Sequence, residues 1–228
     1  PRVRRQRQMC IRDRHIDSPK KITFLHCDYS KINADVKANH YIYNQFDKIA
    51  ACSNGCRNSF LSIEPEFENK TSVVYNCCDF DDVIHQSEET SFLTQADKIN
   101  FVTVARLGRE KGVSRAVQAL AKLDDYKDKL HYYIVGNGIE ESLISKMIAD
   151  YGLENHITMC GELKNPYPYI KAADCLLIPS VSEAAPMVIA EAACLGVPVL
   201  TTKTSSAEEM VDTVSYTHLR AHETLMNL

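Results

Sequence analysis

The sequence predicts an α/β protein built on parallel β-sheets, and two observations support this. Short runs rich in β-branched and aromatic residues recur along the chain, and amphipathic stretches of helical length separate most of them. Apolar strands that alternate with helices indicate a parallel sheet covered on both faces. The expected strands are 21–27, 48–53, 71–76, 100–106, 130–136, 156–161, 174–180 and 197–202. The expected helices are 33–44, 56–63, 112–123, 139–151, 166–172, 186–195 and 205–211.

One segment breaks this alternation. Residues 77–98, CCDFDDVIHQSEETSFLTQADK, are polar and acidic and have no clear periodicity, which is typical of a linker. We therefore expect the C-terminal part of one Rossmann-like domain over 15–80, an interdomain linker over 81–98, and an incomplete second Rossmann-like domain over 99–212.

The two ends of the chain, 1–14 and 213–228, fit neither domain. No apolar stretch follows the arginines of PRVRRQRQMCIRDR, so it does not resemble a secretion signal. A basic arm that binds nucleic acid is one interpretation. Both ends can also be reverse-translated into the DNA adapters of a sequencing library, and this favours translated adapter sequence. On that interpretation the natural protein is cut at both ends.

The composition narrows the class of protein. A formal charge of −4 argues against a general nucleic-acid binder, and a hydrophobic content of 45% is typical of a globular protein. No apolar run reaches the roughly 18–20 residues needed to cross a bilayer. The nine cysteines have no standard zinc spacing, so we expect reduced thiols in a cytoplasmic protein.

Two glutamates flank the start of the expected helix 186–195. Pro186 suits the first helical position and Gly196 suits the residue after the end. Glu183 then lies in the preceding loop, and Glu191 lies inside the helix. This helix start is expected where open α/β sheets bind ligands, so a diphosphate could bind there while the carboxylates accept hydrogen bonds from hydroxyls. On spacing alone, an alternative explains the pair equally well: Glu183 caps the helix, and Glu191 faces solvent.

The pair Glu183-x7-Glu191, framed by PSVSE and EAACLGVPV, resembles the signature of retaining GT-B glycosyltransferases of family 4, the glycosyl transferases group 1. Further segments resemble the family in the same order: FLHCD, VVYNCCDFD, ARLGREKGVSRAVQAL, IVGNGIEESL and GELKNPYPYIKAADCLLIPS. The resemblance covers essentially 20–212. It implies a GT-B fold, in which two Rossmann-like domains face a cleft, truncated here at both ends.

The resemblance assigns the diphosphate of a nucleotide sugar to Arg106 and Lys111. Fixed cations there stabilise the charge that the leaving diphosphate gains. Glu191 would bind the ribose hydroxyls, and Glu183 would contact the transferred sugar as a catalytic residue. Alternatively, Arg106 and Lys111 are two exposed residues of a loop that bind no ligand.

The remaining assignments concern backbone positions and the first domain. His26 is implied to reach the cleft as a catalytic residue, and its alternative is a histidine satisfied by local backbone. Gly136 forms a tight turn close to the nucleotide. The donor-binding loop comprises Ala184, Ala185, Pro186 and Met187. The family commonly has Gly-Phe where this chain has Ala184 and Ala185, and because alanine is small we expect the loop beside the sugar to be kept.

The implied activity is transfer of a hexosyl group, with retention, from a UDP- or GDP-sugar to a carbohydrate or lipid-linked acceptor in surface polysaccharide synthesis. No cofactor besides the donor and no metal is expected, although Asp79-Phe80-Asp81 is the metal motif of another glycosyltransferase fold. The family also suggests contact with the inner face of the membrane. The alternatives are a nucleotide-sugar-binding module without turnover, a GT-B epimerase, or an NAD enzyme, against which Glu141 in the third glycine position argues.

Overall fold

The computed structural model describes residues 18–31, 36–89, 94–204, 206–207 and 209–210. The segments interpreted as adapter sequence, 1–14 and 213–228, lie outside these residues, as does much of the expected helix 205–211. The chain divides into two compact units, Pro1–Tyr75 and Asn76–Leu228. No helix in the described ranges is both long and apolar enough to span a bilayer.

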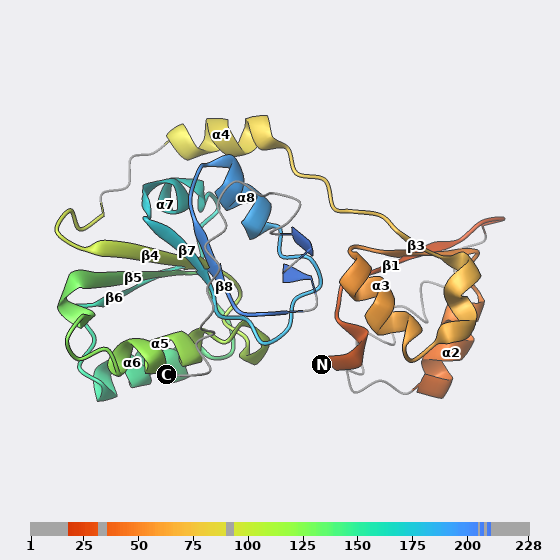
Figure 1. The fold of residues 1–228 in the computed structure, drawn as a ribbon, viewed down its shortest axis with the longest axis horizontal. Coiled ribbons are helices and arrows are strands. Elements are labelled where there is room, and N and C mark those ends of the chain that lie inside the picture. Colours follow the sequence, from red (N-terminus) through yellow and green to blue (C-terminus); the bar gives the residue numbers. More distant parts are fainter. Residues whose placement is uncertain (1–17, 32–35, 90–93, 205, 208, 211–228) are drawn as a thin grey trace. The chain divides into compact units, whose positions relative to one another are not determined.

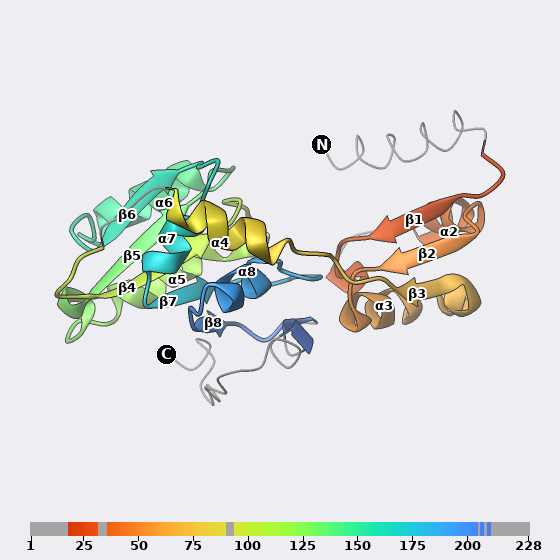
Figure 2. The same ribbon diagram turned by 90° about the horizontal axis from the view of Figure 1, so that it is seen from above.

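The first unit contains a three-stranded parallel sheet in the order β1-β2-β3, whose arrows lie side by side in Figure 2. Its elements are β1 (Ile22–Leu25), η1 (Tyr29–Lys31), α2 (Val36–Asn44), β2 (Lys48–Ala51), α3 (Asn54–Leu61), η2 (Pro65–Lys70) and β3 (Thr71–Val73). An aromatic cluster fills the space between the helices and η2, with the ring of Phe60 5.0 Å from both Tyr29 and Tyr43.

The second unit contains a five-stranded parallel sheet in the order β6-β5-β4-β7-β8. Its strands are β4 (Ile99–Val104), β5 (Leu130–Val135), β6 (Ile157–Gly161), β7 (Cys175–Ile178) and β8 (Val199–Thr201). Its helices are α4 (Phe80–Glu88), α5 (Val113–Ala121), α6 (Glu141–Asp150), α7 (Tyr167–Ala172) and α8 (Val188–Cys194), with η3 (Arg109–Lys111) and η4 (Lys127–Lys129) between them. All eight expected strands therefore form, each shorter than its sequence pattern.

Both faces of this sheet are covered, as Figure 1 shows: α5 and α6 lie on one face, and α4, α7 and α8 lie on the other. Alternate residues of β5 enter the two cores because successive side chains of a strand point to opposite faces. Tyr132 and Ile134 pack with α5 and α6, whereas Tyr133 and Val135 pack with α7 and α8. The α/β fold class is thus confirmed.

One helix was not indicated by the sequence pattern. The segment 77–98, interpreted as a linker without clear periodicity, contains α4, which packs on α7 and α8. Asp79 is the N-cap, and its Oδ1 accepts a hydrogen bond from the backbone N–H of Asp82 at 3.1 Å. Val83 is buried beneath the helix. The helix has only nine residues and is acidic, so its apolar contacts are too few to give a clear pattern.

The strand order places a topological switch between β4 and β7. The chain proceeds from β4 outward to β5 and β6, and then returns to pair β7 with the other edge of β4. In open α/β sheets, ligands bind at the carboxyl ends of the strands beside such a switch.

Candidate functional site

A pocket of about 240 Å³ opens at the carboxyl ends of β4 and β7, at the switch point. The strands contribute its floor, and the loops before α5 and α8 contribute its walls. The lining residues are Thr103, Val104, Ala105, Lys111, Leu177, Ile178, Pro179, Ser180, Glu183, Pro186, Met187, Val188 and Glu191. Five of the expected site residues therefore share one pocket: Lys111, Glu183, Pro186, Met187 and Glu191.

A tight turn holds Lys111 against the end of β7. The turn ends at Gly112, whose φ of 63° lies in the left-handed region. A Cβ at Gly112 would clash with the carbonyl oxygen of Pro179, so only glycine permits this approach. The ordering of this loop places the lysine beside the loop that carries Glu183.

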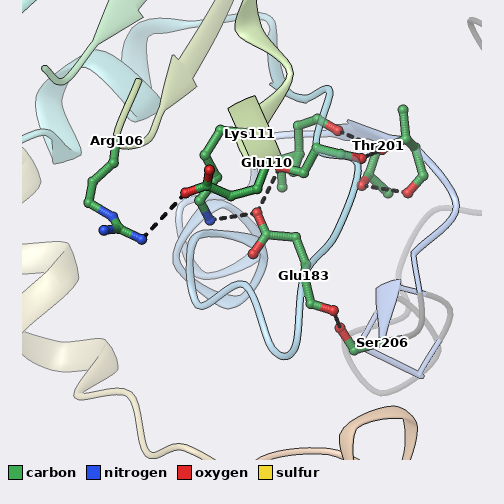
Figure 3. Close-up of polar contacts among 9 residues, drawn as sticks. Arg106, Glu110, Lys111, Glu183, Thr201 and Ser206 are labelled. Carbon is green, nitrogen blue, oxygen red and sulfur yellow. Dashed lines mark hydrogen bonds and ion pairs between the residues drawn. The ribbon is translucent and has the colours of Figure 1, made fainter. Parts of the chain in front are cut away.

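Lys111 and Glu183 form a close ion pair. The Nζ of Lys111 donates to Oε1 of Glu183 at 2.7 Å (Figure 3). The hydroxyl of Ser180 donates to the same oxygen at 2.7 Å. The two side chains are only 21% and 10% exposed. Ser206 also donates to the backbone carbonyl of Glu183 at 3.2 Å. Glu183 is thus held as part of a charged network with a lysine.

Glu191 lies in the first turn of α8. The helix begins at Val188, two residues later than expected, and Pro186 precedes it. The end of the helix agrees with the prediction, since Gly196 has a φ of 72°. Burial raises the pKa of the Glu191 carboxyl, and a hydrogen bond from the hydroxyl of Tyr167 at 3.5 Å partly offsets this. Glu191 is therefore partly buried and faces the pocket.

Arg106 and Gly136 lie near the pocket without being among the described residues that line it. The side chain of Arg106 is 69% exposed and pairs with Glu110 at 3.6 Å (Figure 3). Gly136 has a φ of 134°, and a Cβ there would clash with the carbonyl oxygen of Ala105. This glycine brings the turn after β5 close to the end of β4.

The other expected residues are placed as follows. Pro186 and Met187 line the pocket, whereas Ala184 and Ala185 precede them outside its lining. His26 belongs to the first unit, where it is exposed and its ring stacks on Phe24 with centroids 5.8 Å apart.

Sequence reasoning missed three polar residues at this site. Ser180 holds Glu183, Tyr167 contacts Glu191, and the hydroxyl of Thr103 donates to the carbonyl of Leu177 at 2.6 Å. Ser180 stands three residues before Glu183 in PSVSE, so its spacing offered a signal. Thr103 occupies an ordinary strand position and gave none.

A doubly covered parallel sheet with a pocket at its switch point is typical of α/β domains that bind nucleotides, and comparisons with known proteins show which family this one belongs to. The family model for glycosyl transferases group 1 matches residues 86–215. That match covers more than half of the chain, and the chain belongs to this family.

Individual proteins that the chain resembles are also described as glycosyltransferases. The chain is 25% identical over 178 residues to an uncharacterized glycosyltransferase, MJ1059, of Methanocaldococcus jannaschii, covering 76% of this chain and 43% of that protein. It is 26% identical over 175 residues to the O-antigen biosynthesis glycosyltransferase WclY of Escherichia coli, covering 75% and 48%. The chain spans about half the length of these relatives.

The fold also matches solved structures. Anabaena Alr3699/HepE in complex with UDP and glucose superposes with a TM-score of 0.74 at 21% identity, covering 90% of this chain and 59% of that one. Sucrose-phosphate synthase of Thermosynechococcus elongatus superposes with a TM-score of 0.70 at 18% identity, covering 88% and 54%. These likenesses support the GT-B fold.

Proposed function

We propose that the second unit binds a nucleotide-diphosphate sugar, and that the protein transfers its hexosyl group with retention to a carbohydrate or lipid-linked acceptor. The observation that carries this proposal is the meeting of Lys111, Glu183 and Glu191 in one pocket at the switch point. These residues come from three different segments of the chain. Each offers a charge suited to a different part of such a donor.

Lys111 suits the diphosphate. An ammonium group is a compact charge that binds phosphate oxygens. The turn at Gly112 holds Lys111 beside the carboxyl end of β7. The charge on the diphosphate grows as its bond to the sugar breaks, so a cation already in place stabilises the transition state more than the ground state. In this proposal Lys111 does this without a metal ion.

The carboxylates suit the hydroxyls of the donor. Oε1 of Glu183 already accepts two hydrogen bonds, and its orientation is thereby fixed for the sugar. Glu191 lies across the pocket with Tyr167 and would accept from the ribose. In the proposed reaction the bond from the anomeric carbon to the diphosphate breaks, and a bond to the acceptor oxygen forms on the same face. The acceptor proton passes to the departing diphosphate.

The nucleotide and the acceptor are inferred from relatives. The UDP and glucose in the Anabaena structure favour a UDP-sugar over a GDP-sugar. The O-antigen relative, and a Campylobacter jejuni relative that acts on a diphospho-undecaprenol sugar, favour synthesis of a surface polysaccharide on a lipid carrier.

Calorimetric titration of the chain with UDP and with GDP tests the donor site. We expect UDP to bind, and Lys111→Ala to weaken that binding at least about tenfold, as loss of a charge-assisted contact does. Lys146→Ala removes an exposed lysine of α6 and is the matched control. Equal affinities in both variants would refute the assignment of Lys111. Release of nucleotide diphosphate in a longer form of the protein then separates transfer from binding without turnover.

A further inference from the structure

A second cluster of ionisable side chains lies in the first unit and takes no part in the proposed donor site. His40 comes from α2, Glu64 is the residue before η2, and Glu66 lies inside η2. The Nδ1 of His40 is 2.9 Å from Oε2 of Glu64 and 3.5 Å from Oε1 of Glu66. Each residue offers one ligand atom, and these atoms all lie within 4.8 Å of one another.

Glu64 is unusual because it is a buried carboxylate with an unused oxygen. Its side chain is 2% exposed, and its Oε1 has no hydrogen-bond partner among the described residues. A buried charge is costly unless its oxygens are paired, and His40 pairs only one of them. The free oxygen belongs to the same carboxyl group that faces His40, so this cluster retains an unused capacity to bind a cation.

Core packing fixes two of the three ligands. The backbone N–H of Glu64 donates to the carbonyl of Phe60 at 2.9 Å, which ties Glu64 to the end of α3. The ring of His40 packs on that of Phe67, with centroids 4.9 Å apart. Lys70 is a cation of η2, the same segment as Glu66. Its ammonium group donates hydrogen bonds to the backbone carbonyls of Tyr43, Asn44 and Phe46.

We propose that His40, Glu64 and Glu66 form a binding site for a divalent cation of the zinc type. One imidazole nitrogen and two carboxylates are ligands that such a cation accepts, with water in the fourth position. Bonds of about 2.0–2.2 Å place tetrahedral ligands about 3.4 Å apart, close to the 3.5 Å between His40 and Glu66. The side chain of His40 is 36% exposed and that of Glu66 is 66% exposed, which leaves the fourth position open to water.

This site would be structural. It joins α2 to the segment after α3, two parts of the first unit that the aromatic cluster and the hydrogen bonds of Lys70 also hold together. The bound charge would offset the buried carboxylate of Glu64. The proposal is independent of the donor site, because none of its residues lines that pocket.

Titration with Co²⁺ followed by visible absorption is the direct test. Cobalt takes the place of zinc, and a thiolate band in the near ultraviolet would reveal that cysteines bind it instead. We expect one Co²⁺ per chain, no thiolate band, and a higher melting temperature. Glu66→Gln and His40→Gln should each weaken binding at least about tenfold.

His85→Gln is the matched control, because His85 and Glu89 form an exposed pair at 3.8 Å on α4. It should bind Co²⁺ as the unaltered chain does. Glu66 is 66% exposed, so Glu66→Gln is expected to fold, and circular dichroism checks this. Absence of binding below about 1 mM, affinity that neither variant changes, or a spectrum that shows only thiolate ligation would each overturn the proposal.

Discussion

Two cations of the same loop, Lys111 and Arg106, form ion pairs that differ sharply in length and burial. Lys111 and Glu183 lie 2.7 Å apart with side chains 21% and 10% exposed, whereas Arg106 and Glu110 lie 3.6 Å apart and are 69% and 47% exposed. The resemblance assigned both cations to the diphosphate. The structure gives Lys111 a fixed place in the pocket and leaves Arg106 at the surface, so the two should contribute unequally.

The largest effect is expected at Lys111. We predict that Lys111→Ala lowers kcat by about 10²-fold, as removal of a preorganised charge from a transition state does. Steady-state assay of nucleotide diphosphate release in the longer protein measures this. A near-normal kcat would mean that the lysine serves only to position Glu183.

The second largest difference is expected in how much each ion pair contributes to the free energy of unfolding. Glu183→Ala leaves a largely buried lysine without its partner, and we expect it to lower the free energy of unfolding by about 1–3 kcal/mol. Glu110→Ala should change it by less than about 0.5 kcal/mol, because exposed pairs contribute little. Urea unfolding of both variants makes the comparison. Similar losses in both would show that burial does not distinguish the pairs.

Arg106→Ala should have a smaller effect on turnover than Lys111→Ala, on the order of tenfold. To bind the donor, Arg106 must leave its ion pair with Glu110, and its long side chain must become ordered. The entropy lost in this ordering offsets part of the binding free energy that Arg106 contributes. Arg109→Ala, which removes the exposed arginine of the same loop, is the control. A loss as large as that of Lys111→Ala would mean that Arg106 closes on the diphosphate when the donor binds.

The smallest effect concerns pH. Burial raises the pKa of Glu191, so its carboxylate takes up a proton at a higher pH than an ordinary glutamate. As pH falls through that value, Glu191 loses an acceptor, and UDP binding should weaken a few-fold. Because Glu191→Gln cannot titrate, the difference between its affinity profile and that of the unaltered chain, from about pH 4.5 to 7.5, isolates this group. Parallel profiles would contradict the role of Glu191.

Much of the fold could be predicted because strands of a parallel sheet are continuous apolar runs that stand out from their surroundings. The helix α4 could not, since its nine residues bury little besides Val83 and Ser87 and carry an acidic surface. Asp79, the first carboxylate of the Asp79-Phe80-Asp81 motif, is the residue that caps this helix.

Some features of the site could also be predicted from the sequence, and others could not. The family resemblance pointed to Lys111, Glu183 and Glu191, which line one pocket, whereas the spacing of the two glutamates alone left their roles undecided. The orientation of Arg106 depends on competition from Glu110, and the support of Glu183 depends on Ser180 and Lys111. The contact of Lys111 with Glu183 joins two loops that are far apart in the sequence, so no single segment encodes it.

A crystal structure of the chain with UDP tests the central claim most directly. The account predicts that the diphosphate lies within hydrogen-bonding distance of Nζ of Lys111 and that the ribose hydroxyls face Glu191. Nucleotide bound elsewhere, with the Lys111–Glu183 pair and its pocket left empty, would contradict it.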